Sequence, residues 1–141
     1  MIQIILGDKG TGKTKRLIDL ANESLKNEHG DIIFIDDDKR YMYDLRHEIR
    51  FVDASEYPVG HKCTANEMLG FICGMLSVNF DITLVVMDAF KKLIRTPLDA
   101  PEMEEFFAKL EKLSAAHNCN FLISVSAAAD DVPEYIQKYA I

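Results

Sequence analysis

The residues whose types and spacing are best suited to chemistry stand near the N-terminus, where glycines alternate with lysine and hydroxyl side chains. They form the run Gly7-Asp8-Lys9-Gly10-Thr11-Gly12-Lys13-Thr14, which fits the pattern G-x-x-x-x-G-K-[ST]. Glycines allow positive φ, so successive backbone N–H groups can turn toward one point and form a nest for anionic oxygens. The positive end of a following helix adds to that field. The run therefore predicts a loop that binds phosphate.

Individual side chains of this loop have separate expected roles. Lys13 is expected to contact the β- and γ-phosphates of a nucleotide, and the Thr14 hydroxyl to take one coordination place on Mg²⁺. Lys9 either contacts a phosphate, in its own subunit or a neighbour, or faces solvent. The residues predicted to bind the nucleotide are Gly7, Asp8, Lys9, Gly10, Thr11, Gly12, Lys13, Thr14 and Lys15.

The flanks of the loop decide whether the pattern is more than a glycine-rich turn. An apolar run, residues 2–6, precedes it, and helical spacing of apolar residues begins at Lys13. This order of strand, glycine loop and helix favours nucleotide binding over an accidental match.

Acidic residues follow two further runs that have the composition of buried strands. Asp88 comes directly after residues 82–87 and looks like an aspartate that holds Mg²⁺ through water, although such a residue can also cap a turn. Ala89 stands next, where many ATPases have a glutamate that polarises water. Residues 36–38 are three aspartates that end the run 32–35, and either one of them is the base for hydrolysis or they are a solvated strand end.

Other polar residues near the expected strand ends leave two interpretations open. Ser126, at the tip of the last apolar run, either senses the γ-phosphate or stabilises a turn. Lys91, Lys92 and Arg95 either contact a phosphate or a partner, or form a solvated face. The four histidines show no metal-ligand spacing.

Composition narrows the class of protein. A chain of 141 residues, 48% of them hydrophobic, suits a single domain over 1–141 with a real core. The net charge of −7 disfavours a general nucleic-acid or anionic-membrane surface. Cys63, Cys73 and Cys119 lack C-x-x-C spacing and are expected to be reduced core residues. No apolar run is long enough for a membrane span and the N-terminus enters a strand at once, so we expect a cytoplasmic protein.

Strands that alternate with helices predict an α/β fold. We expect a three-layer α/β/α sandwich around a mostly parallel sheet of four to five strands, with right-handed crossovers. Strand patterns cover 2–6, 32–35, 50–53, 82–87 and 121–126, and helical patterns cover 13–27 and 40–49 and begin again at 64, 99 and 131. Ligands gather at the carboxyl ends of parallel strands, so the loop, the aspartates and Ser126 should meet at one crevice.

Local signals predict three helix starts and one packing contact. Residues 64–67 form a capping box, and Asp99 and Asp131 are expected to be N-caps. Gly70 and Gly74 form a small-residue stripe that we expect to pack closely on the sheet.

Taken together, these residues resemble the P-loop NTPases and, within them, the RecA-like ATPase core. In RecA-type recombinases one strand ends in a pattern similar to Phe-Ile-Asp-Ala-Glu, whose Glu is the hydrolytic base. Phe34-Ile35-Asp36-Asp37-Asp38 looks like this pattern and places Asp38 at the Glu position. Residues 84–88 resemble the Walker B strand of the family, and Ser126 stands where the family usually has a Gln sensor. The DNA-binding loops are absent, so recombination is not implied.

The resemblance implies ATP and Mg²⁺ as ligands, Lys13 and Asp38 as catalytic residues, and Thr14 and Asp88 as metal ligands. Because Asp is one methylene shorter than Glu, we expect a slow ATPase that acts as a switch or assembles with itself. The chain also looks like short bacterial P-loop proteins often labelled twitching-motility retraction ATPases. That likeness implies ATP binding and does not imply pilus retraction.

Two other functions stay open, namely a small-molecule kinase and a module that binds nucleotide without hydrolysing it. GTP is disfavoured because no Asn-Lys-x-Asp run is present. The strand order of the family would place residues 2–6 beside the strand of Ser126, with the strand of Asp88 beyond it. The first strand would then lie near an edge of the sheet, which favours self-association or a protein partner.

Overall fold

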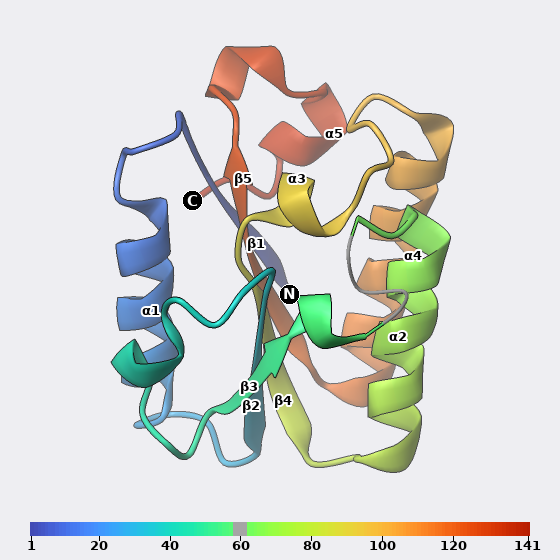
Figure 1. Ribbon diagram of the computed structural model, residues 1–141. Helices are drawn as coiled ribbons and strands as arrows, with labels where there is room; N and C mark the ends of the chain where they lie inside the picture. Colours follow the sequence, from blue (N-terminus) through green and yellow to red (C-terminus); the bar gives the residue numbers. More distant parts are fainter. Residues whose placement is uncertain (58–61) are drawn as a thin grey trace.

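The computed structural model describes residues 1–57 and 62–141, and helices alternate with strands along it (Figure 1). Within these residues, five strands form one sheet: β1 (Ile2–Gly7), β2 (Asp31–Asp36), β3 (Arg50–Asp53), β4 (Ile82–Met87) and β5 (Asn120–Ser126). Their order is β1-β5-β4-β2-β3, and each neighbouring pair is parallel. The predicted α/β fold with a parallel sheet is confirmed.

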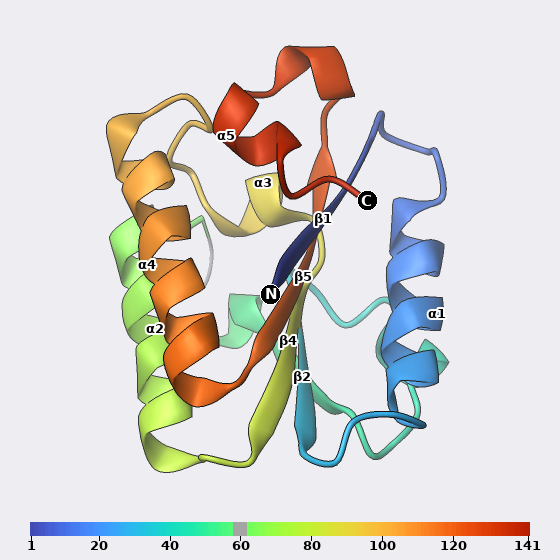
Figure 2. The same cartoon turned by 180° about the vertical axis from the view of Figure 1, so that it is seen from behind.

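Helices cover both faces of the sheet, which confirms the three-layer arrangement (Figures 1 and 2). One face carries α1 (Lys13–Ser24), and the other carries α2 (Ala65–Val78) and α4 (Pro101–His117). Two one-turn helices, α3 (Phe90–Leu93) after β4 and α5 (Glu134–Gln137) after β5, lie near the carboxyl end of the sheet. None of the helices in the described part of the chain has the length and apolar character needed to cross a membrane.

Successive residues of the central strands face opposite sides, which explains why these runs are apolar throughout. Val85 packs in the core that includes α2 and α4, whereas Val86 packs in the core that includes α1. Both side chains are fully buried. The sheet is therefore held from both faces, and its strands are fixed relative to one another.

The strands end at one level, and this positions the site. Gly7 pairs with Ser126 across β1 and β5. Met87 pairs with Ile35 on one side and with Ile123 on the other. The residues that follow these positions therefore meet at the same edge of the sheet.

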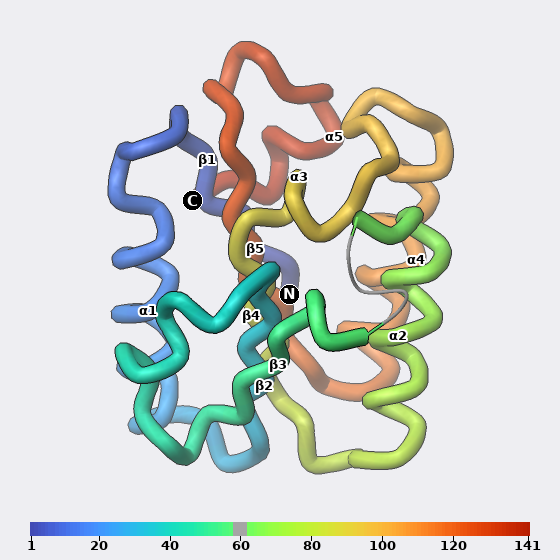
Figure 3. Tube along the Cα trace, in the orientation of Figure 1, coloured from blue at the N-terminus to red at the C-terminus, as the bar shows by residue number. Residues whose placement is uncertain are grey.

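The first strand lies at an edge of the sheet, next to β5 and with β4 beyond, as the resemblance implied. The C-terminal residues cover the middle of this edge: the Ile4 N–H donates to the Tyr139 carbonyl at 2.8 Å, and the Ile141 N–H donates to the Ile4 carbonyl at 3.0 Å. Figure 3 shows the C-terminus beside β1. An edge with a covered midpoint is a weaker template for self-association than an open one.

The helix predicted over 40–49 does not form. This segment contains a short 3₁₀ turn, Met42–Asp44, although Leu45 and Ile49 are buried as their spacing suggested. The side chain of Asn22 explains the difference, because it donates to the Asp44 carbonyl at 3.1 Å and accepts from the Arg46 N–H at 2.9 Å. These two backbone groups bond to the Asn22 side chain of α1, and they are therefore not available for the backbone hydrogen bonds of a helix.

Of the three helix starts predicted from capping residues, one has the expected cap and two do not. The capping box from Thr64 to Glu67 is confirmed. Asp99 and Asp131 are not N-caps: Ala100 precedes α4 and Pro133 precedes α5, and neither makes a side-chain capping bond. Proline in or beside the first turn supplies the backbone angle without a capping side chain. The helix predicted over 13–27 ends at Ser24 and continues as hydrogen-bonded turns.

The surface of α2 corrects two further predictions. Its buried face is made of Ala65, Met68, Ile72 and Leu76, so Gly70 and Gly74 lie on its exposed side. A Cβ at either glycine would meet nothing within 4 Å, so they do not pack on the sheet. Cys73 is exposed on the same side, while Cys63 and Cys119 are buried as expected. The run Tyr57-Pro58-Val59-Gly60, whose proline and glycine predict a turn, lies mostly outside the described residues.

Candidate functional site

The glycine loop joins β1 to α1 and closes around one carbonyl oxygen. The Asp8 carbonyl accepts from the Thr11 N–H at 3.2 Å, the Thr11 hydroxyl at 2.7 Å and the Lys13 ammonium at 2.8 Å. Gly10 and Gly12 have φ of 85° and 82°, a region that favours glycine, and α1 begins directly afterwards. The loop thus has the strand–loop–helix context that its sequence predicted.

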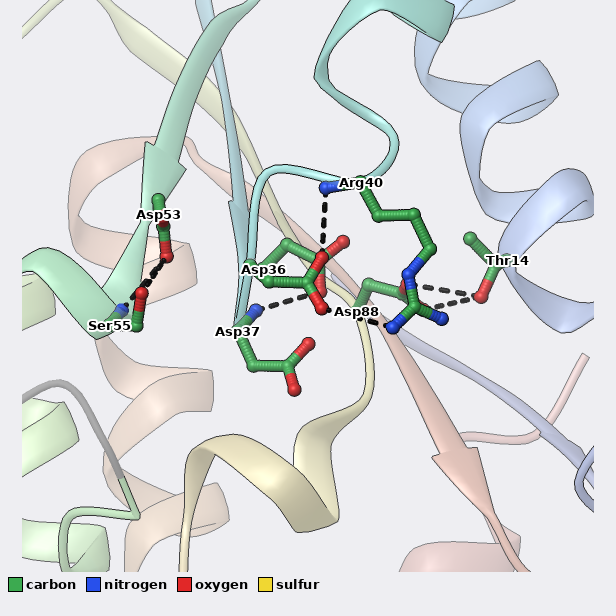
Figure 4. Close-up of polar contacts among 8 residues, drawn as sticks. Thr14, Asp36, Asp37, Arg40, Asp53, Ser55 and Asp88 are labelled. Carbon is green, nitrogen blue, oxygen red and sulfur yellow. Dashed lines mark hydrogen bonds and ion pairs between the residues drawn. The ribbon is translucent and has the colours of Figure 1, made fainter.

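Thr14 and Asp88 are brought together from α1 and the end of β4 (Figure 4). The Thr14 hydroxyl lies 3.0 Å and 3.3 Å from the two Asp88 carboxylate oxygens. Asp88 is buried, with 3% of its surface exposed, and its N–H donates to the Ile35 carbonyl at 3.0 Å. A hydroxyl and a carboxylate at this spacing are hard oxygen donors of the kind that Mg²⁺ prefers.

Ser124 supports Asp88 from the neighbouring strand, a role that the sequence prediction missed. Its hydroxyl donates to the Asp88 carboxylate at 2.6 Å and accepts from the Ala89 N–H at 2.9 Å. Ser124 is buried, whereas Ser126, the residue predicted as a possible sensor, is exposed. The sequence feature that could have identified this role is a hydroxyl residue between two apolar residues, Ile123 and Val125, of a buried strand.

Ala89 turns the chain from β4 into α3. Its φ of 51° is left-handed, which is uncommon for a residue with a Cβ and marks strain that the surrounding contacts must hold. Phe90 and Leu93 of α3 are fully buried, while Lys91 and Lys92 are exposed and line the cleft. Strain beside a predicted metal ligand is typical of a functional site.

The three aspartates at the end of β2 differ in environment. Asp36 is buried, with 2% of its surface exposed, and one of its carboxylate oxygens accepts from the Asp37 N–H at 2.7 Å. Burial, followed by the neighbouring Asp37 side chain and the charge of Asp88, raises the pKa of Asp36 to about 8, although the Asp37 N–H acts to lower it. Asp38 accepts from the Arg40 N–H at 2.8 Å and pairs with its guanidinium at 3.3 Å.

A cleft of about 840 Å³ connects these groups, a volume within the range of ligand pockets. Of the predicted loop residues, Gly7, Asp8 and Thr11 support the loop without lining the cleft, and the six that line it are Lys9, Gly10, Gly12, Lys13, Thr14 and Lys15. The aspartates 36–38, Asp88 and Ser126 line it too, so the predicted convergence is confirmed. Arg95 lies elsewhere and donates to the Lys62 carbonyl at 2.9 Å.

No protein-family model and no curated protein matches the sequence. Among solved structures, the chain is similar to the KaiC-like protein PH0186 of Pyrococcus horikoshii, with 16% identity and a TM-score of 0.65 over 98% of this chain and 68% of that one. It is also similar to the flagellar accessory protein FlaH of Methanocaldococcus jannaschii, with 12% identity and a TM-score of 0.60 over 97% of this chain and 65% of that one. The chain spans about two thirds of either structure. Together with the sheet order and the glycine loop, these likenesses identify the fold of the chain as the RecA-like P-loop fold.

Proposed function

We propose that the chain binds a nucleoside triphosphate, ATP in the first place, together with Mg²⁺ and hydrolyses it slowly. The observation that carries this proposal is the meeting of Lys13, Thr14 and Asp88 at one cleft. An ammonium group, a loop of backbone N–H groups and a pair of hard oxygen donors are what a magnesium-bound triphosphate requires. Lys13 would exchange its bond to the Asp8 carbonyl for a phosphate oxygen.

The metal would be held by the Thr14 hydroxyl directly and by Asp88 through water. When bound, Mg²⁺ supplies charge neutralisation at the β- and γ-phosphate oxygens. Ser124 keeps the Asp88 carboxylate turned toward Thr14 through its 2.6 Å hydrogen bond. The protein's own contribution is therefore orientation and charge, fixed by the ends of neighbouring strands.

Asp38 is the proposed base for hydrolysis, and its surroundings support a slow reaction. The Arg40 guanidinium lies 3.3 Å from one of its carboxylate oxygens and the Arg40 N–H donates to the other at 2.8 Å, so both oxygens already have partners that an attacking water would have to replace. The residue after Asp88 is Ala89, so no glutamate stands there to orient water. Both features also favour the alternative of a module that binds nucleotide without turnover.

A small-molecule kinase is a weaker alternative for this cleft. A kinase is expected to carry a mobile, arginine-bearing lid over the donor, and Arg95, the arginine that follows Asp88, does not line the cleft. The switch and self-assembly roles stay proposals, supported by the edge position of β1 and opposed by its C-terminal cover. The likeness to proteins labelled twitching-motility retraction ATPases adds only ATP binding.

Nucleotide binding is tested by thermal unfolding with ATP, ADP and GTP, each with and without Mg²⁺. A ligand that binds the folded state raises the melting temperature, so ATP with Mg²⁺ should give the largest shift. Lys13→Ala should abolish it. Lys26→Ala is the matched control, because Lys26 is an exposed lysine that follows α1 and lies away from the cleft. No shift at millimolar ATP with Mg²⁺, or an equal shift in Lys13→Ala, would overturn the proposal.

Hydrolysis is tested separately by phosphate release. Asp38→Asn should reduce the rate, while Asp44→Asn, the same substitution on an exposed residue of the same cleft, should not. Tight binding without release over hours would select the non-hydrolysing module. Transfer of labelled phosphate to a metabolite would select the kinase.

A further inference from the structure

We infer that Asp36, Asp37 and Asp38 form a binding site for a hard divalent cation that is held without any nucleotide. Each side chain offers one carboxylate oxygen, and these oxygens all lie within 4.8 Å of one another. Asp36 ends β2 and Asp37 and Asp38 follow it, so these ligands come from a different strand end than the Thr14–Asp88 pair of α1 and β4 (Figure 4).

The spacing of the three oxygens fits a metal ion of this class. Two oxygens on opposite sides of an ion are about 4.2 Å apart for Mg²⁺ and about 4.6 to 5.2 Å apart for Ca²⁺. Oxygens within 4.8 Å of one another can therefore surround either ion with small side-chain shifts. Water would supply the remaining coordination places, because the cluster lines an open cleft.

The carboxylate of Asp36 distinguishes this cluster from an ordinary acidic surface. Its side chain is almost completely buried and lines the cleft, yet its Oδ2 atom has no hydrogen-bond partner among residues 1–57 and 62–141. A buried polar atom without a partner is costly, and more so when the group carries charge. A cation at Oδ2 would remove that cost.

Negative charge around the cluster exceeds the positive charge that pairs with it. Arg40 neutralises Asp38 in part, and across the described residues it is the only cationic side chain within ion-pair distance of the cluster. Lys91 and Lys92 line the same cleft without pairing with any described carboxylate, and Asp88 adds a further negative charge nearby. An unbalanced group of carboxylates next to a low-dielectric interior attracts a cation.

Occupation of this site would act on the proposed hydrolysis through Asp38. A carboxylate oxygen that coordinates a cation has its lone pair engaged by the metal and is not available to take a proton from water. Filling the site would therefore slow hydrolysis.

The test is Mn²⁺ binding to the full chain, freed of metal and nucleotide, measured by the loss of the electron paramagnetic resonance signal of free Mn²⁺. We expect one saturable site with sub-millimolar affinity, displaced by Mg²⁺ or Ca²⁺. Asp37→Asn should weaken it by at least about tenfold. Asp36→Asn should do the same without endangering the fold, since the amide has nearly the shape of the carboxyl group and carries no charge.

Two controls use the same substitution outside the cluster. Asp44→Asn lies in the same cleft and should leave Mn²⁺ affinity unchanged, and Asp88→Asn should weaken it less than Asp37→Asn does. The inference is overturned if no saturable binding is found, if Asp37→Asn binds as the natural chain does, or if Asp88→Asn alone abolishes binding. Because no nucleotide is present, a failure of the proposed nucleotide binding would not affect this result.

Discussion

Ser124 and Asp88 lie on neighbouring strands and share a buried hydrogen bond of 2.6 Å, in which the serine hydroxyl donates to the carboxylate. The same hydroxyl accepts the N–H of Ala89, the residue in the left-handed turn. One side chain thus orients the predicted metal ligand and anchors the start of α3.

Ser124→Ala should destabilise the protein because it removes both bonds from a buried position. A hydrogen bond to a buried charged group is worth about 1.5 to 3 kcal/mol, so we expect a loss of that order in the free energy of unfolding. Urea denaturation measures it. Ser126→Ala, an exposed position two residues on, should change stability by less than about 0.5 kcal/mol. Equal effects of the two substitutions would contradict the role assigned to Ser124.

Gly74→Ala should stabilise the protein. Gly74 is exposed inside α2, a Cβ there would meet nothing within 4 Å, and glycine inside a helix costs about 0.5 to 1 kcal/mol relative to alanine. Gly70→Ala should behave in the same way. Gly30→Ala is the opposing control, because its Cβ would lie 2.1 Å from the Asp81 carbonyl oxygen. Thermal denaturation of the three variants checks the prediction, and a lower melting temperature for Gly74→Ala would show it to be wrong.

Asp36→Asn should change how stability depends on pH in metal-free protein. The pKa of Asp36 is about 8 in the folded state and about 4 in the unfolded state, so between these values the folded chain keeps a proton that the unfolded chain has lost. This group therefore lowers stability progressively as pH rises from about 4 to about 8.

Urea denaturation at pH 5 and pH 8, with a chelator present, measures this effect. The natural chain should lose more stability over this interval than Asp36→Asn does, and the variant should be the more stable of the two at pH 8. Asp44→Asn should follow the natural chain. A variant with the same pH dependence as the natural chain would refute the raised pKa of Asp36.

Alkylation should distinguish the three cysteines. Cys73 is exposed, whereas burial, together with the charge of Glu28, raises the pKa of Cys119 to about 11 and leaves it mostly as an unreactive thiol. Burial also raises the pKa of Cys63. Iodoacetamide at pH 8 should add one group to the folded chain and three groups in urea, as counted by mass spectrometry. Addition to folded Cys73→Ser would count against these burial assignments.

The sequence was sufficient for the features that depend on runs of residue type. Continuous apolar runs identified β2 and β4 because these strands are buried on both faces, and the spacing of glycines and Lys13 identified the loop. The prediction of a helix over 40–49 was wrong. Leu45 and Ile49 are buried, but an irregular segment can bury two residues at this spacing as well as a helix can. What decided the outcome was the Asn22 side chain, a contact distant in sequence.

Site details that depend on register could not be read from residue types alone. The three aspartates are the same residue type, and only the point at which β2 ends makes Asp36 a buried strand residue and leaves Asp38 to pair with Arg40. Ser124 and Ser126 are two residues apart and so point to the same face of β5, and only the pairing of β5 with β4 shows which of them meets Asp88.

Strand β5 lies between β1 and β4, so it sets the distance between the phosphate loop, which follows β1, and the Asp88 carboxylate, which follows β4. Moving this strand by a single residue would turn Ser124 to the other face and bring an aliphatic side chain against the carboxylate. Insertions should therefore be tolerated between α1 and β2, where the chain only has to cross from helix to sheet. One extra residue within β5 should uncouple the two halves of the cleft even in a chain that still folds.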